Sequence, residues 1–213
     1  MERRMLFSLI VLYSVLIKCF TVEIVEIHQL EKECYGSKNG FTLSGSPADH
    51  YKRLVEMYTG CTYVQGNLEI TFLESKNYDL SFLSTIRVVT GYVLIALVYV
   101  NIIPLTSLKL IRGDTTYEYK GEQYSLFVAV NSPRQPTGAG LKELHLPQLA
   151  EISNGKVFFR ANRELCFVNT ILWSDIVDDK SMNSVTFKDG GYSKNCKPSV
   201  SQHLQREKML EQQ

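Results

Sequence analysis

The chain has almost no net charge, and it lacks the short motifs that mark common catalytic or metal sites. Its 23 basic and 22 acidic side chains give a formal charge of +1, which indicates neither nucleic acid nor an acidic lipid surface as a partner. It contains no His-Glu-x-x-His, no Gly-x-Ser-x-Gly, no phosphate-binding glycine loop and no kinase signature. The four histidines are scattered: His28, His50, His145 and His203. We therefore expect no enzymatic activity, no metal and no cofactor for this chain.

Long apolar runs are scarce. An apolar stretch over residues 5–17 follows a short arginine-containing start and ends at Lys18. This layout is typical of a secretory signal peptide, and the stretch is too short to cross a bilayer. A second apolar region, residues 92–111, is interrupted by polar residues and by Pro104, which disfavours a membrane helix. We expect a signal peptide at residues 1–22 and no membrane span in the chain.

Cysteine is also infrequent, with five in the chain, of which Cys19 falls at the end of the expected signal peptide. The other four form an even set in a chain expected to enter the secretory pathway, which predicts disulfides, and four cysteines allow three pairings. We favour Cys34 with Cys61 and Cys166 with Cys196, because each pair then brackets one end of the repeat described next. Each loop of about 30 residues would contribute roughly 3–4 kcal/mol. A metal site is disfavoured because no Cys-x-x-Cys with nearby histidines occurs.

A repeated register is the main positive feature of the sequence. In four segments an apolar or aromatic residue is followed by others three and six positions later, and then by a glycine. The segments begin at Tyr58, Leu83, Leu105 and Leu146, and their glycines are Gly66, Gly91, Gly113 and Gly155. The glycine spacings of 25, 22 and 42 residues (66 to 91, 91 to 113, 113 to 155) fit coils of roughly 20–29 residues, the last gap holding two. We therefore predict stacked coils with glycines of positive φ at the turns.

Short strands are expected after the glycines. We predict strands at residues 68–71, 92–96 and 157–160, a fifth, degenerate coil at 124–130, and a strand-like piece at 41–43. A helix is predicted to begin at Pro47 and to end before Gly60, because Ser46 and Asp49 have the spacing of a capping box. The predicted fold class is therefore mainly β, a leucine-rich β-solenoid with an N-terminal capping helix and ends closed by disulfides.

Several motifs resemble the first extracellular ligand-binding domain, the receptor L domain, of the epidermal growth factor receptor family of receptor tyrosine kinases. The resemblance covers about residues 34–196, and L domains of insulin receptors resemble these motifs less. The segments that carry it are Gly66-Asn67-Leu68-Glu69-Ile70-Thr71, Tyr78-Asp79-Leu80-Ser81-Phe82-Leu83, Gly91-Tyr92-Val93-Leu94-Ile95-Ala96-Leu97, Ile103-Pro104-Leu105, Ile111-Arg112-Gly113, Gly140-Leu141-Lys142-Glu143-Leu144 and Trp173-Ser174-Asp175-Ile176-Val177.

This resemblance implies a right-handed β-solenoid and agrees with the disulfide pairing favoured above. It also implies that the open face of a sheet binds epidermal-growth-factor-like peptides together with a second L domain. Aligned locally, Glu118 is the expected charge partner of a basic ligand side chain. The full set of implied ligand-facing residues is Phe41, Leu43, Phe72, Leu97, Tyr117, Glu118, Ala129 and Val130.

The chain departs from the family by a small insertion at residues 120–123 and by one added residue between Phe72 and Tyr78. The family continues past Cys196 into a cysteine-rich module, whereas residues 197–213 here are polar and are expected to form a disordered tail. We expect an L domain over residues 34–196, secreted or on the outer side of the plasma membrane, as a fragment or truncated product without the kinase.

The expected partners are an epidermal-growth-factor-like peptide and a full-length receptor of the same family. Two alternatives stay open at this point. The first is a soluble decoy that sequesters the ligand. The second is a structural or adhesive solenoid with no growth-factor ligand, which would need no contiguous exposed apolar patch on its strand face.

Overall fold

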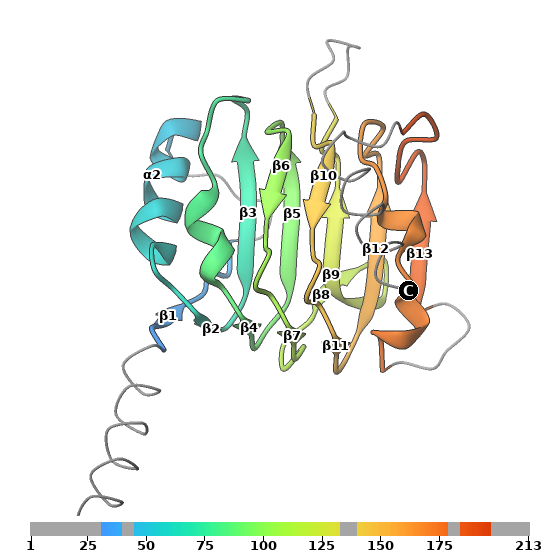
Figure 1. Ribbon diagram of the computed structural model, residues 1–213, viewed down its shortest axis with the longest axis horizontal. Helices are drawn as coiled ribbons and strands as arrows, with labels where there is room; N and C mark the ends of the chain where they lie inside the picture. Colours follow the sequence, from blue (N-terminus) through green and yellow to red (C-terminus); the bar gives the residue numbers. More distant parts are fainter. Residues whose placement is uncertain (1–30, 40–44, 133–139, 179–183, 197–213) are drawn as a thin grey trace, which may run out of the picture.

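The computed structural model describes residues 31–39, 45–132, 140–178 and 184–196, and this part of the chain is mainly β-structure (Figure 1). The expected signal peptide at 1–22, the expected tail at 197–213, and Phe41 and Leu43 lie outside the described residues. Within the described ranges no helix is long and apolar enough to cross a bilayer.

Within the described ranges the strands form three sheets, and all neighbouring strands are parallel except β8 and β9. The first sheet has the order β1 (Glu33–Tyr35), β2 (Tyr63–Gln65), β4 (Val88–Val89), β7 (Leu110–Ile111) and β11 (Glu151–Ile152). The large sheet has the order β3 (Leu68–Leu73), β5 (Val93–Val98), β9 (Glu122–Ala129), β12 (Lys156–Arg160) and β13 (Val185–Lys188), with β8 (Tyr117–Tyr119) antiparallel to β9. A small sheet pairs β6 (Ile102–Pro104) with β10 (Glu143–His145) and lies in front of the large sheet in Figure 1.

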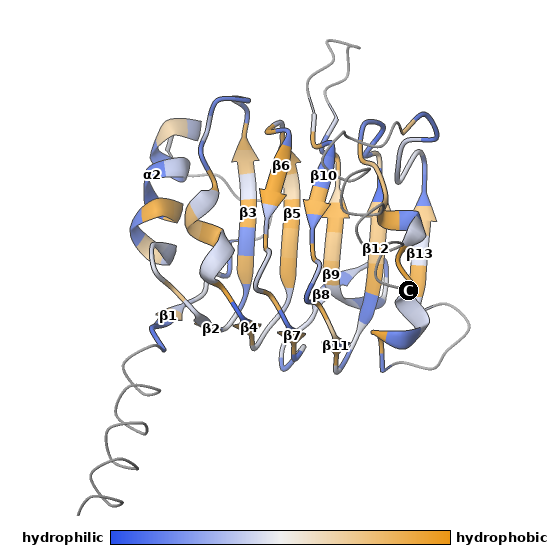
Figure 2. Ribbon diagram, in the orientation of Figure 1, coloured by the Kyte–Doolittle hydropathy of each residue, from blue (hydrophilic) through white to orange (hydrophobic). Residues whose placement is uncertain are grey.

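The two larger sheets take their strands in chain order, so the chain returns to each sheet with every repeat, and we call the residues of one such repeat a coil. The strands predicted at residues 68–71, 92–96 and 157–160 are present, and the degenerate coil at 124–130 supplies β9, between β5 and β12. The strand-like piece predicted at 41–43 lies outside the described residues. Inside the large sheet Ile70, Ile95, Val128 and Phe159 pair in register, and each is completely buried. Each inward side chain therefore packs on its equivalent in the next coil. In Figure 2 most of the length of these strands is orange, the colour of hydrophobic residues.

The predicted apolar register is confirmed in its first three segments, whose members are all fully buried: Tyr58, Cys61, Val64, Leu83, Ile86, Val89, Leu105, Leu108 and Ile111. In the fourth segment Ile152 is fully buried, whereas Leu146 is half-buried because it lines a surface groove. Three short 3-10 turns complete the coils: η1 (Ser81–Thr85), η2 (Val168–Thr170) and η3 (Trp173–Asp175).

In the part of the chain that the structure describes, the α-helix is α2 (Pro47–Tyr58), and it begins and ends as predicted. The backbone N–H of Asp49 donates to the Ser46 hydroxyl, and the Asp49 carboxylate accepts from the Ser46 backbone, which completes the capping box. The helix buries His50, Leu54 and Tyr58 and packs on β1 and β3 at one end of the sheets.

Three of the four repeat glycines adopt the predicted conformation, with φ of 103° at Gly66, 69° at Gly113 and 76° at Gly155. The prediction is wrong for Gly91, which does not have positive φ. A Cβ at Gly91 would meet the Asn67 side-chain oxygen and would lie 2.9 Å from the carbonyl carbon of Gly66. The close approach of two coils, rather than the backbone conformation, requires glycine at this position.

Both predicted disulfides are present. Cys34 is joined to Cys61 with Cα atoms 5.9 Å apart, and Cys166 to Cys196 with Cα atoms 5.5 Å apart. The first links β1 to the segment before β2, and the second links the chain after β12 to the chain after β13. Each disulfide therefore closes a loop near one end of the stack.

We predict that Gly91→Ala destabilises the fold by about 3 kcal/mol, because the added methyl overlaps the neighbouring coil. Gly121→Ala is the matched control, since Gly121 has φ of 77° but nothing within 4 Å of its Cβ position. Backbone strain alone should then cost about 1 kcal/mol. Urea unfolding of the two variants measures both losses, and equal losses would contradict the proposed close approach.

Candidate functional site

A row of four left-handed residues crosses the large sheet at the carboxyl ends of its strands. Phe72, Leu97, Val130 and Ala161 have φ of 58°, 57°, 60° and 52°, and none of them is glycine. Each directly follows a residue that is paired in register with its equivalents: Thr71, Ala96, Ala129 and Arg160. We call Phe72, Leu97, Val130 and Ala161 the left-handed row.

The left-handed residues keep two consecutive side chains off the core. In a regular strand side chains alternate, so Thr71 on the outer face would be followed by an inward residue 72. Instead Phe72 is half-buried, and Leu73 returns to the core with no exposed surface. Leu97 and Val98 repeat the same arrangement on β5. The outer face thus gains one additional row of side chains, at a conformational cost of about 1–2 kcal/mol for each non-glycine residue.

Two buried asparagines stabilise this strained backbone, and each directly follows a member of the row. The Asn131 side chain accepts from the Val98 N–H at 3.0 Å and donates to the Ile95 carbonyl at 3.1 Å. Its amide also donates to Asn162 Oδ1 at 3.0 Å. Asn162 donates to the carbonyls of Val128 and Gly191. The two amides supply hydrogen bonds from one coil to the next where the regular strand pairing ends.

Aromatic side chains cover the part of the outer face nearer the amino ends of the strands. There Phe127 and Phe158 stack with ring centroids 4.8 Å apart, and both are almost completely buried. Tyr117 and Tyr119 of β8 pack over Phe127 at 4.8 and 5.3 Å. The Arg160 guanidinium donates to the Tyr119 hydroxyl at 2.6 Å, which anchors β8 to the sheet.

The aromatic side chains over the outer face determine which of the predicted ligand-facing residues are exposed. Tyr117 is half-buried in the aromatic cluster, and Ala129 is 2% exposed beneath it. Phe72 and Leu97 are half-buried in the left-handed row, and Val130 is 40% exposed. The exposed apolar surface of this face therefore lies along the row rather than over the middle of the sheet.

Residues 120–123, which were predicted to be an insertion, lie at the turn of a tight hairpin. Lys120 and Gly121 have φ of 55° and 77° between β8 and β9, which is the pattern of a two-residue type I′ turn. Glu118 is exposed on β8 opposite Gln123, at the amino end of β9. It lies near the opposite end of the strands from Val130, so a ligand touching both would extend along the length of the strands.

One buried carboxylate on this face was missed by the sequence analysis. Glu69 is 4% exposed and accepts hydrogen bonds from Ser37 Oγ at 2.6 Å, the Asn39 N–H at 2.7 Å and the Tyr92 hydroxyl at 2.6 Å. Burial raises the pKa of Tyr92, and the hydrogen bond to Glu69 raises it further, so this hydroxyl remains a donor. The only signal in the sequence was a glutamate at an outward position of a strand.

His50 of α2 adjoins the left-handed row. It is 7% exposed, and its ring meets the edge of Phe72 with centroids 5.8 Å apart. Burial lowers the pKa of His50 below its ordinary value of 6.5, Arg53 lowers it further, and Asp49 opposes them. The imidazole beside Phe72 is therefore neutral at pH 7.

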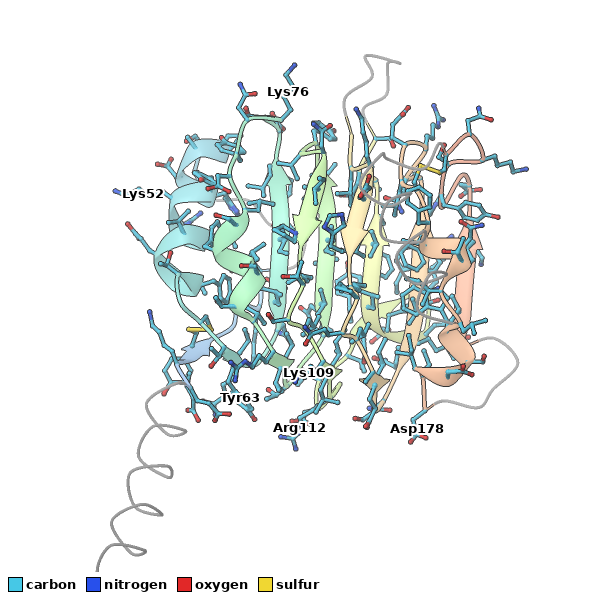
Figure 3. The ribbon with its side chains drawn as sticks, viewed as in Figure 1. Lys52, Tyr63, Lys76, Lys109, Arg112 and Asp178 are labelled. Atoms are coloured by element: carbon cyan, nitrogen blue, oxygen red, sulfur yellow. A yellow bond between two sulfur atoms is a disulfide. The ribbon has the colours of Figure 1, made fainter. Side chains whose placement is uncertain are left out.

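The charged side chains labelled in Figure 3 do not form one patch. Figure 3 shows Lys76 at one end, and Lys109, Arg112 and Asp178 at the other. Arg112 pairs with Asp114 at 3.6 Å. In the described part of the chain no group of three or more His, Cys, Asp or Glu residues could hold a metal ion.

Comparison with known proteins assigns this arrangement to a family. Residues 60–177 match the family described as Receptor L domain. The chain is 45% identical over 148 residues to the epidermal growth factor receptor of Gallus gallus and 41% identical over 150 residues to that of Drosophila melanogaster, each alignment covering 70% of this chain. It is 40% identical over 163 residues, 76% of this chain, to the receptor tyrosine-protein kinase erbB-4 of Mus musculus.

The protein therefore contains a receptor L domain. Within that class it belongs to the epidermal growth factor receptor family, as its motifs predicted. The aligned parts make up 20%, 10% and 12% of these three relatives, so the chain spans a minor part of the proteins it matches. The family match covers the L domain and no kinase.

We predict that the free energy of unfolding falls between pH 7 and pH 5, in part through His50. Burial lowers the pKa of His50 in the folded state, whereas the unfolded chain takes up a proton near pH 6.5, so acidification below that pH favours unfolding. The slope from one group is at most about 1.4 kcal/mol per pH unit. Urea unfolding of His50→Gln should show a flatter pH dependence than the parent over this range. Identical slopes for His50→Gln and the parent would contradict this assignment.

Proposed function

We propose that this chain is the extracellular ligand-binding L domain of an epidermal-growth-factor-receptor-like protein, and that the left-handed row contacts an epidermal-growth-factor-like peptide. The observation that carries the proposal is the row itself, in which three strained coils present Phe72, Leu97 and Val130 side by side on one face. Strained conformations that persist in register are typical of functional surfaces. We further infer a right-handed winding of the coils, an end-capping role for α2, and a domain that extends over residues 34–196.

The left-handed row would supply the apolar contact with the peptide, and Glu118 would fix the orientation of the peptide on the sheet. Covering a large apolar side chain such as Leu97 contributes roughly 1.5–3 kcal/mol when the contact is complete. The exposed carboxylate of Glu118 would pair with a basic ligand side chain near the far end of the strands. Tyr117 would contribute its exposed edge, whereas Ala129 would support Val130 from beneath. Phe41 and Leu43 stay candidates outside the described residues.

The chain alone would bind weakly. In a longer receptor a second L domain would hold the same peptide, and joining two sites in one molecule can raise affinity by about 10²-fold or more through effective concentration. Kinase activity and signalling across the membrane would belong to that longer receptor, while this chain would supply one half of the ligand contact.

We predict that Leu97→Asp and Val130→Asp each weaken binding of an epidermal-growth-factor-like peptide at least about tenfold, because a desolvated carboxylate would oppose the apolar contact. Ile102→Asp is the matched control, since Ile102 is 41% exposed on β6 of the small sheet and is not a member of the row. Isothermal titration calorimetry measures the three affinities. An equal loss in all three variants, or no binding by the parent at millimolar peptide, would overturn the proposal.

Glu118→Lys tests the charge partner separately. It should weaken peptides that carry an arginine or lysine at the contact, and it should leave a peptide with alanine at that position unaffected. The difference should shrink as the salt concentration rises, since exposed charge pairs are screened. Equal affinities of the parent and the variant for the basic peptide would remove Glu118 from the site.

A further inference from the structure

A largely apolar surface lies on the other side of the core from the left-handed row. It is a groove of about 470 Å³ between β10 and η2, next to the small sheet that stands in front of the large sheet in Figure 1. Apolar side chains form most of its lining, among them Leu146, Phe167 and Ile171. Beside it Leu172 is 70% exposed. The groove shares no residue with the proposed growth-factor contact.

The groove exists because the segment that follows Leu165 pairs with the coil of β10 only at its start and then turns away. The Cys166 N–H donates to the Lys142 carbonyl at 2.7 Å, which begins a pairing of this coil with the coil of β10. The next residue, Phe167, has φ of 66° and turns the chain into η2. Among the described residues β10 consequently has a strand partner, β6, on one side only.

The unpartnered edge of β10 carries backbone hydrogen-bonding groups. The Glu143 N–H donates to the Asn101 carbonyl at 3.0 Å, on the side of β6. Because successive peptide groups of a strand point to opposite sides, the N–H and carbonyl of Leu144 point away from β6, toward the groove. Such an edge is a template for one more strand.

The carboxylate of Glu143 at the edge of the groove favours basic side chains on an added strand. Glu143 Oε2 lies 2.7 Å from His145 Nε2, and the Glu143 side chain is 22% exposed. Both residues occupy the outer face of the small sheet, whereas Leu144 faces the core and is 7% exposed. A strand added beside β10 would therefore place alternate side chains in the apolar groove and the others near the Glu143 carboxylate.

We propose that this groove binds an extended segment of a partner protein, added as a third strand beside β10. An aliphatic side chain of the segment enters the groove near Phe167 and Ile171, and a flanking lysine or arginine pairs with Glu143. The backbone of the segment bonds to the Leu144 edge, and the pockets for alternate side chains select its sequence. This binding is independent of the growth-factor contact, so failure of one proposal leaves the other intact.

The test uses the full chain labelled with ¹⁵N and the peptide acetyl-Thr-Lys-Val-Lys-Leu-Thr-amide, whose aliphatic and basic residues alternate. Titration should shift the amide resonances of Leu144, His145 and Val168 and leave that of Val130 unmoved. A peptide with an N-methyl group on its valine should lose binding, because it lacks the backbone donor. Exchanging both lysines for glutamate should weaken binding at least about tenfold.

Substitution of Glu143 tests the charge contact separately from the backbone contact at Leu144, and substitution of Glu151 is the control. Glu143→Gln should weaken the lysine peptide by about tenfold and leave the glutamate peptide unchanged or improved, whereas Glu151→Gln on β11 should have no effect. No shifts at millimolar lysine peptide, equal binding of the N-methylated peptide, or equal affinity of Glu143→Gln and the parent would overturn the proposal. A concentration-dependent mass without peptide, with shifts at the same amides, would assign the groove to a second copy of the chain and also overturn it.

Discussion

The hydrogen bonds of Asn131 and Asn162 are the constraint on which the outer face of this protein depends. Four residues with bulky or methyl side chains hold a backbone conformation that such residues seldom adopt, and two of them directly precede these asparagines. Each buried amide engages backbone groups of neighbouring coils, so the amides bridge the coils where strand pairing ends. Without such partners the buried backbone groups would be unsatisfied, and the strained residues would relax toward a regular strand.

Packing beneath this row follows from the parallel order of the strands. One apolar cluster fills the space between the sheets, and a second, aromatic cluster lies on the outside of the large sheet under the β8–β9 hairpin. The hairpin is anchored to the sheet by Arg160 and by the ion pair of Lys156 with Glu122 at 2.7 Å. The outer face is therefore divided into a closed aromatic part and an open part along the left-handed row.

Much of the fold was predictable because its signals are local or repeated. The capping box at Ser46 needs four residues, the coil register recurs along the chain, and the cysteine positions relative to the repeat favoured the observed pairing. The left-handed row was not predictable in the same way, because Phe, Leu and Val disfavour that conformation and only contacts between coils stabilise it. Glu69 was missed because its burial depends on Ser37, Asn39 and Tyr92, which lie in other coils. The small sheet was missed because strands of three residues carry too little periodicity.

The position of each left-handed residue in a separate coil has an evolutionary consequence. The backbone hydrogen bonds around the row come from the asparagines and from neighbouring strands. The side chain at each position of the row can therefore be exchanged without altering the backbone that carries it. Phenylalanine, leucine, valine and alanine already occupy equivalent rungs of one sheet. A gene that encodes such a row can acquire a new binding preference through single-codon changes, while the residues of the core stay the same.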